Sequence, residues 1–388
     1  MKQLLKIIKR SIKRIIFIFK DLFKYIFFLF KVDRRKIVFI NFNGKGYGCN
    51  PKYIAESLIR NNVECKMVWL VRNKNEEMPS MIKKVKYGSI RAYYEMATAK
   101  IWVSNTRNYK FAIKKKEQFY IQTWHASLGY KKVEGEIEEY LDKKYVEEAK
   151  KDGRTTDLII SDNDISTNLY KNNFWYDGEV KNIGLPRNDI LYSRPSEVIK
   201  KVYNYFNLSE NKKIILYEPT FRDNYDFDMI NFDYNKLLDV AKEKFNKDFV
   251  LLIRLHPNIS RYDKDIKYSE NIINATNYPD NQELLSAAEI GITDYSSISF
   301  ELAMTDKPVF LLCKDIEEYS KKERGLNFKF EELPFDCAIN EKKLFENIKN
   351  FSSERYIIDC TNFFNNIKMV KTSNAADEVV RIIRKRIN

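Results

Sequence analysis

The chain has 388 residues, 44% of them hydrophobic, and this length exceeds what one hydrophobic core usually covers, so two domains are expected. Its five cysteines are scattered without a CxxC pair, which argues against a zinc site or a disulfide framework and favours a reduced cytoplasmic setting. The formal net charge is +14, and residues 1–31 supply more than half of this excess, because they contain nine Lys or Arg and a single Asp.

Residues 1–31 are predicted to form an amphipathic, basic helix that lies on a membrane. Lysines recur at steps of three, four or seven along one helical face, and Leu, Ile and Phe fill the rest. The longest charge-free stretches, 15–19 and 25–30, are far shorter than the ~20 residues that cross a bilayer. Such a helix suits the anionic cytoplasmic leaflet, where it would attach the protein peripherally. A helix packed on the domain is the alternative, and nucleic-acid binding is disfavoured because no recognisable binding module accompanies the basic residues.

After residue 35, short apolar runs alternate with longer amphipathic ones, which is typical of parallel sheets covered on both faces. The expected strands are 36–42, 65–71, 100–105, 118–124, 157–163, 213–219, 248–255, 289–294 and 307–313. The helix-like stretches are 51–62, 81–98, 137–151, 195–206, 235–246, 296–305 and 375–387. Five strands precede residue 190 and four follow it, so we expect an α/β protein with two doubly wound halves, 32–192 and 193–388, facing across a cleft.

The sequence contains only two histidines, His125 and His256, and each directly follows a predicted strand. Ligands bind beyond the carboxyl ends of the strands in doubly wound sheets, so a cleft between the halves would bring both imidazoles together. An unperturbed imidazole titrates between about pH 5 and 8, which suits proton transfer. The alternative for each histidine is a hydrogen-bonded structural role.

A strand that ends at Asp294 is followed by a helix start with Ser296 and Ser297, and free amide groups beside two hydroxyls can receive a phosphate. The alternative is that Asp294 or Ser296 merely caps the helix. Four arginines at predicted strand ends or adjoining loops could clamp a diphosphate, unless each is a surface or salt-bridged side chain: Arg187, Arg222, Arg254 and Arg324.

A glycine-rich loop, NGKGYG at residues 43–48, lacks the GxGxxG and GK[ST] patterns, so neither a dinucleotide nor a P-loop site is predicted. Its glycines could instead let the loop approach a substrate closely. The sequence has no HExxH, no GxSxG and no characteristic pair of metal-binding carboxylates, so we expect neither a metal nor a cofactor.

Six motifs in this order, QTWHASLGYKK, GLPRNDIL, ILYEPTFRD, IRLHP, ITDYSSISFELA and EEYSKKERGLNF, resemble the CDP-glycerol glycerophosphotransferase family of teichoic acid and capsule synthesis. NPKYIAESL near the amino terminus also matches, and the similarity spans roughly residues 36–335. The resemblance implies a GT-B-like fold and attachment to the inner leaflet of the membrane. It also implies transfer of a polyol phosphate from CDP-glycerol or CDP-ribitol to a lipid-linked acceptor, such as an undecaprenyl-linked saccharide or polymer.

The resemblance also implies roles for individual residues, with His125 as general base on the acceptor side and His256 against the donor phosphates in the second half. We expect the pKa of His125 to lie near the working pH. Further donor contacts implied by the family pattern are Trp124, Ala126, Ser127, Leu128, Arg187, Pro219, Thr220, Arg254, Ser296, Ser297 and Glu301.

The chain departs from the commoner family pattern at two places. It reads WHASL where many members read WHGTP, and Asn327 and Lys329 replace a usual Tyr and Asp. The choice between glycerol and ribitol, and the acceptor, therefore stay open. A GT-B nucleotide-sugar glycosyltransferase and a non-catalytic membrane scaffold are the rival functions.

Overall fold

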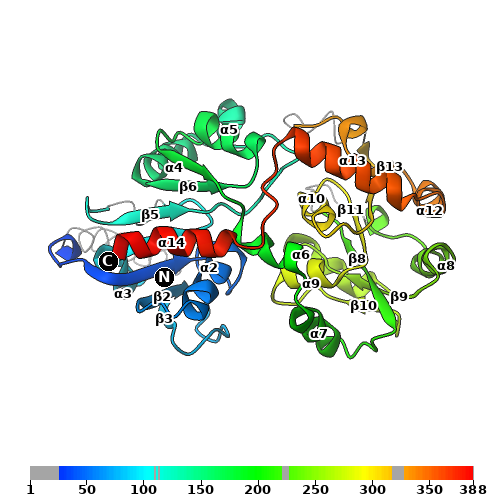
Figure 1. The fold of residues 1–388 in the computed structure, drawn as a ribbon, viewed down its shortest axis with the longest axis horizontal. Helices are drawn as coiled ribbons and strands as arrows, with labels where there is room; N and C mark the ends of the chain where they lie inside the picture. Colours follow the sequence, from blue (N-terminus) through cyan, green and yellow to red (C-terminus); the bar gives the residue numbers. More distant parts are fainter. Residues whose placement is uncertain (1–25, 109–110, 112–113, 221–226, 317–326, 388) are drawn as a thin grey trace, which may run out of the picture.

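The computed structural model describes residues 26–108, 111, 114–220, 227–316 and 327–387. Two parallel sheets, each in its own body, lie side by side (Figure 1). The first has the order β3-β2-β1-β4-β5-β6-β7 and the second the order β10-β9-β8-β11-β12-β13. Both are Rossmann-like sheets with crossover connections, as the alternation of apolar and amphipathic runs predicts.

The first sheet consists of β1 (Asp33–Ile40), β2 (Lys66–Val71), β3 (Lys83–Lys86), β4 (Ala99–Ser104), β5 (Phe119–Gln122), β6 (Leu158–Ser161) and β7 (Glu179–Asn182). The second consists of β8 (Lys212–Glu218), β9 (Asp248–Ile253), β10 (Ile272–Asn274), β11 (Ile290–Thr293), β12 (Val309–Leu312) and β13 (Asp336–Ala338). All nine expected strands occur. The four that sequence reasoning missed, β3, β7, β10 and β13, are short and lie at the sheet edges.

The helices of the first half are α2 (Cys49–Arg60), α3 (Ile90–Thr98), α4 (Lys143–Thr155), α5 (Asp164–Asn173) and α6 (Asp189–Ser193), with 3₁₀ turns η2 (Glu134–Tyr140) and η3 (Pro186–Asn188). Those of the second half are α7 (Ser196–Tyr205), α8 (Tyr234–Phe245), α9 (Asn281–Ala287), α10 (Ile298–Ala303), α12 (Glu341–Lys349), α13 (Ser353–Asn366) and α14 (Ala375–Ile387), with η4 (Phe227–Met229), η5 (Pro257–Asp265) and η6 (Phe330–Glu332). The expected helix 81–98 was wrong in its first half, where β3 forms instead.

Strand β1 shows why the first sheet is covered on both faces. Ile37 and Phe39 belong to one buried apolar cluster, whereas Val38 and Ile40 belong to another. Successive side chains of a strand point to opposite faces, so a continuous apolar run requires helices on both sides. The same rule explains β3, where only Val85 is buried and the three lysines of KKVK are exposed, as suits an edge strand.

The carboxyl-terminal helix α14 returns to the first sheet, although residues 193–388 were expected to form the second domain. Val379, Val380 and Ile383 pack in the same apolar cluster as Ile37. Figure 1 shows α14, in red, lying over the first sheet. The buried Asp189 carboxylate accepts hydrogen bonds of 2.9 Å from the first two backbone amides of α14. This carboxylate satisfies amides that a helix start leaves unpaired, and it fixes the point where the chain crosses back.

The predicted membrane helix lies mostly outside the described residues, which begin at Ile26 near the end of that segment. Among the helices that the structure describes, none combines the length and the apolar character needed to cross a membrane.

Candidate active site

Both histidines line one cavity of about 470 Å³, which residues from the two halves enclose together. The cavity lies at the carboxyl ends of β1, β5, β9 and β11, where doubly wound sheets bind ligands. Seven of the predicted site residues line it: His125, Arg187, Arg254, His256, Ser296, Ser297 and Glu301. In the parts of the chain that are described, no group of three or more His, Cys, Asp or Glu side chains could hold a metal ion.

His125 follows β5 and is held in one tautomer. Its Nδ1 atom lies 2.8 Å from the Asn105 carbonyl oxygen, which can only accept, so Nδ1 carries the proton and Nε2 keeps its lone pair. The ring packs edge-on against Phe42, with 5.3 Å between the ring centroids. This arrangement leaves Nε2 as the atom that can take a proton.

Burial lowers the pKa of His125 to about 4, and the nearby Arg187 guanidinium acts in the same direction. The pKa of His125 therefore lies below the working pH near which it was expected. The imidazole is neutral at neutral pH, which is the state that a general base requires. A bound diphosphate brings negative charge, which raises the pKa of a neighbouring imidazole and strengthens it as a base.

The turn that presents His125 is strained. Trp124 has a φ of +50°, a left-handed conformation that is unusual for an aromatic residue and costs roughly 1–2 kcal/mol. Asn50 holds this turn, because its side-chain amide donates to the Trp124 carbonyl over 3.0 Å. Its amide oxygen also accepts from the Arg187 backbone N–H at 3.0 Å. Strain of this kind persists where the surroundings impose it, often at functional sites.

His256 has the opposite tautomer. Its Nδ1 atom accepts a hydrogen bond from the Asn258 backbone N–H at 3.2 Å and caps the following 3₁₀ turn, so the neutral ring carries its proton on Nε2. Burial lowers the pKa of His256 as well. One cavity thus contains an imidazole that can accept a proton and another that can donate a hydrogen bond.

Arg187 and Glu301 form a buried ion pair across the cavity wall. Burial by itself would lower the pKa of Arg187, but the Glu301 carboxylate raises it above its ordinary value, so the guanidinium stays charged. The second Glu301 oxygen accepts from the Gln282 amide at 3.0 Å. Both residues were predicted to contact the donor, and in the structure they contact each other.

Arg254 lines the part of the cavity wall that the second half forms, and residues of the same half orient its side chain. Its guanidinium donates to the Tyr278 carbonyl at 2.6 Å and lies 3.8 Å from the buried carboxylate of Glu218. Burial raises the pKa of Glu218 to about 7, and Arg254 partly opposes this rise. Another cavity residue, Asn281, donates to the same carboxylate at 3.2 Å.

The serines at the start of α10 are half-buried and line the cavity, but the hydroxyl of Ser296 also accepts from the Ile298 backbone N–H at 3.3 Å. Ser296 thus satisfies one amide at the helix start, whereas Ser297, which occupies the N-cap position, makes no side-chain capping hydrogen bond. Asp294 does not cap the helix. Its carboxylate accepts from the Thr220 backbone N–H at 3.0 Å and ties the ends of β8 and β11 together.

The remaining predicted residues have other positions. Ser127 and Leu128 are buried beside the cavity, with Leu128 in the apolar core of the second half. Trp124, Ala126, Pro219, Thr220 and Asp294 are likewise absent from the cavity lining. Arg222 and Arg324 lie outside the described residues.

The cavity lining includes two further groups of residues, of which sequence reasoning anticipated the first in part and missed the second. One is the loop between β1 and α2, which contributes the exposed cation Lys45 together with Gly46 and Gly48, so the glycine loop does approach the site. The other is the start of α9, where Asp280 binds Lys52 of the first half over 2.5 Å. The NGKGYG and NPKYIAESL motifs signalled the first group. The second had no signal, because Asp280 and Lys52 are 228 residues apart.

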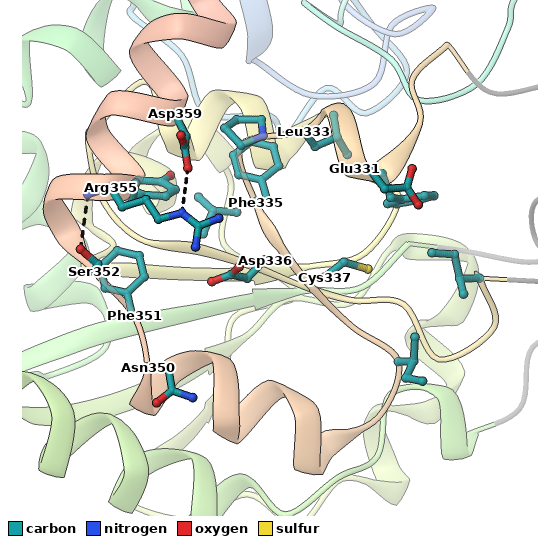
Figure 2. Close-up of a pocket in the computed structure, with 16 residues that line it drawn as sticks. Glu331, Leu333, Phe335, Asp336, Cys337, Asn350, Phe351, Ser352, Arg355 and Asp359 are labelled. Atoms are coloured by element: carbon teal, nitrogen blue, oxygen red, sulfur yellow. Dashed lines mark hydrogen bonds and ion pairs between the residues drawn. The ribbon is translucent and has the colours of Figure 1, made fainter.

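A second cavity, of about 430 Å³, lies beside β13 and α13 in the second half (Figure 2). Aromatic side chains such as Phe335 and Phe351 line it, and its one arginine, Arg355, is turned toward Asp359 at 3.4 Å. It contains neither histidine, so the chemistry is assigned to the first cavity.

The sequence pattern of the CDP-Glycerol:Poly(glycerophosphate) glycerophosphotransferase family matches residues 22–385. The chain belongs to this family. It is 30% identical to the teichoic acid poly(glycerol phosphate) polymerases of Staphylococcus epidermidis and Bacillus subtilis, over 92% and 91% of its own length. It spans only about half the length of these two relatives, 51% and 49% respectively.

Solved structures of this family show the same fold. The wall teichoic acid polymerase TagF is 30% identical to the chain with a TM-score of 0.83, over 97% of this chain and 96% of that one. One histidine variant of TagF was solved after a soak with CDPG. A UDP-GlcNAc 2-epimerase from Neisseria meningitidis shares the fold alone, at 13% identity and a TM-score of 0.54.

Proposed function

We propose that this glycerophosphotransferase family member transfers glycerol phosphate from CDP-glycerol to a hydroxyl of a membrane lipid-linked acceptor and releases CMP, in teichoic acid or capsular polymer synthesis. The observation that carries the proposal is the pair of histidines in opposite tautomers within one cavity. Family membership and the CDPG soak of TagF support the donor. Residues 32–192 then carry the acceptor side, and residues 193–373 most of the donor side.

In the proposed reaction the acceptor oxygen attacks the phosphorus that bears glycerol. His125 Nε2 takes the hydroxyl proton, and the bond between this phosphorus and the bridging oxygen to CMP breaks. His256 donates from Nε2 to the diphosphate, where negative charge accumulates, and Arg254 lies on the same wall. The half-buried hydroxyls of Ser296 and Ser297 can donate to the same oxygens.

Membrane attachment is part of the proposal, because the acceptor is lipid-linked. Residues 1–31 would bind the anionic inner leaflet. Deletion of this segment should release the protein from vesicles while activity on a soluble acceptor remains, and persistent vesicle binding would contradict the assignment.

The test is CMP release by the full-length protein with a lipid-linked saccharide acceptor, offering CDP-glycerol, CDP-ribitol and a UDP-sugar in parallel. Release from CDP-glycerol that His125→Ala abolishes supports the function. Release from CDP-ribitol alone changes the polyol, and turnover of the UDP-sugar alone assigns the chain to the nucleotide-sugar glycosyltransferases.

A further inference from the structure

A third cavity, of about 520 Å³, lies at the amino ends of the central strands β1, β4 and β5, at the opposite end of the first sheet from His125. It is formed where three distant segments meet: the chain entering β1, the starts of β4 and β5, and the last turn of α14. Figure 1 shows the two ends of the described chain close together on this side of the first half. Since β1 has eight residues at about 3.3 Å each, the amino ends of these strands are about 26 Å from their carboxyl ends, where the candidate active site lies.

The charged side chains around this cavity are Lys31, Arg34, Lys100, Arg386 and a single carboxylate, Glu117. Lys100 donates to the backbone carbonyl of Glu117, and the Arg386 guanidinium lies 4.3 Å from the centre of the Phe119 ring. None of the four cations forms an ion pair with another described residue.

Neighbouring cations on the same sheet differ in this respect. Arg35 pairs with Glu64 at 2.6 Å, and Lys36 pairs with Glu95 at 2.8 Å. The four cations at the cavity thus lack the countercharges that Arg35 and Lys36 have, so an anion would be attracted there and a cation repelled.

Apolar side chains are exposed next to these charges. Phe28, Leu29 and Phe30 are 43%, 85% and 46% exposed. Phe30 is held in place, because it packs edge-on against Tyr94 at 5.6 Å and the Lys115 ammonium donates to its carbonyl. Fixed aromatic residues beside unpaired cations are typical of surfaces that meet a bilayer at the level of its headgroups.

We propose that this cavity binds the phosphate of an anionic phospholipid headgroup, while residues 26–30 enter the upper acyl region. The inference rests on the proposed membrane-associated function and adds a second contact beyond residues 1–25. The headgroup site orients the first half so that the carboxyl ends of its strands, where His125 lies, are held away from the lipid contact. A chain-like acceptor that extends from the membrane can reach the active site at those strand ends.

The test is flotation of the full-length protein with phosphatidylcholine vesicles and with vesicles that also contain phosphatidylglycerol. The variant replaces Arg34, Lys100 and Arg386 by Gln. A matched control replaces three exposed lysines without ion pairs, Lys143, Lys144 and Lys200, which gives the same net charge.

Each surface cation contributes on the order of fivefold to binding of an anionic membrane, so the site variant should bind phosphatidylglycerol vesicles at least tenfold more weakly than the control does. Glu117→Gln should strengthen this binding, because it removes the one lining carboxylate. The site variant and the Glu117→Gln variant should both bind phosphatidylcholine vesicles as the wild type does.

Equal losses in the site variant and the control would overturn the proposal, as would displacement from the vesicles by millimolar inorganic phosphate alone. CMP release with a soluble acceptor is measured in parallel. Its absence in the wild type would refute the proposed function and leave the lipid result standing, whereas normal release with unchanged vesicle binding in the site variant would refute only the lipid site.

Discussion

Replacement of His125 by Ala tests the assignment of the general base. Burial depresses its pKa from 6.5 to about 4, a shift that corresponds to about 3 kcal/mol in favour of the neutral ring. At pH 7 only roughly 0.1% of His125 side chains with this pKa would be protonated. The kcat/KM for CDP-glycerol should therefore be level from about pH 5 upward with respect to this group.

The bound diphosphate changes the expectation for kcat. Its negative charge raises the imidazole pKa, so the acid limb of kcat should lie at higher pH than the acid limb of kcat/KM. His125→Ala should lower kcat on the order of 10²- to 10⁴-fold and remove the limb.

The assay is CMP release between pH 4.5 and 8.5, with His256→Ala as control. The control should raise KM for CDP-glycerol and lower kcat, yet it should retain the acid limb that His125 produces. An acid limb of kcat/KM near pH 6.5, or a His125→Ala enzyme with turnover within tenfold of the wild type, would refute the reasoning.

Three further substitutions test the site from its supporting residues. Glu301→Gln leaves the Arg187 guanidinium buried without a countercharge, so urea unfolding should show a loss of about 3–5 kcal/mol, and a double change that also makes Arg187 Met should recover part of it. Burial raises the pKa of Glu218 from 4.5 to about 7, so the native protein keeps a proton that the unfolded chain releases. This group should therefore lower stability by about 3 kcal/mol as the pH rises from 4.5 to 7, and Glu218→Gln should remove that contribution from the slope seen in urea titrations across this range. Asn50→Asp keeps the acceptor for the Arg187 amide but loses the donor to the Trp124 carbonyl, so steady-state kinetics should show a lower kcat with little change in KM for the donor; a change in KM alone would contradict the positioning role.

The long strands could be predicted from the sequence, and the short edge strands could not. Strand β1 has a continuous apolar run because both of its faces are covered, and that run is visible without a structure. Strand β3 buries only Val85 among three lysines, so no apolar pattern distinguishes it from the helix that follows. The return of α14 was equally hidden, because an apolar helical face does not indicate which sheet it covers.

The candidate site was predictable in its residue types and not in its protonation states. Strand ends identified His125 and His256, since ligands bind at those ends. Their tautomers depend on the Asn105 carbonyl and the Asn258 amide, which are partners that only the folded backbone supplies. The Arg187 and Glu301 pair likewise joins residues 114 positions apart.

The two departures from the family pattern meet in the structure. Leu128, in the segment that follows His125, packs in the core of the second half, and the hydroxyl of Tyr130 lies 2.8 Å from that of Ser299. The amide of Asn327 donates to the carbonyls on either side of Tyr130, at 2.9 and 3.1 Å. Neither Leu128 nor Asn327 lines the cavity, so these substitutions act on how the His125 segment is fastened to the second half. The departures therefore lie where the His125 segment meets the second half, outside the lining of the cavity.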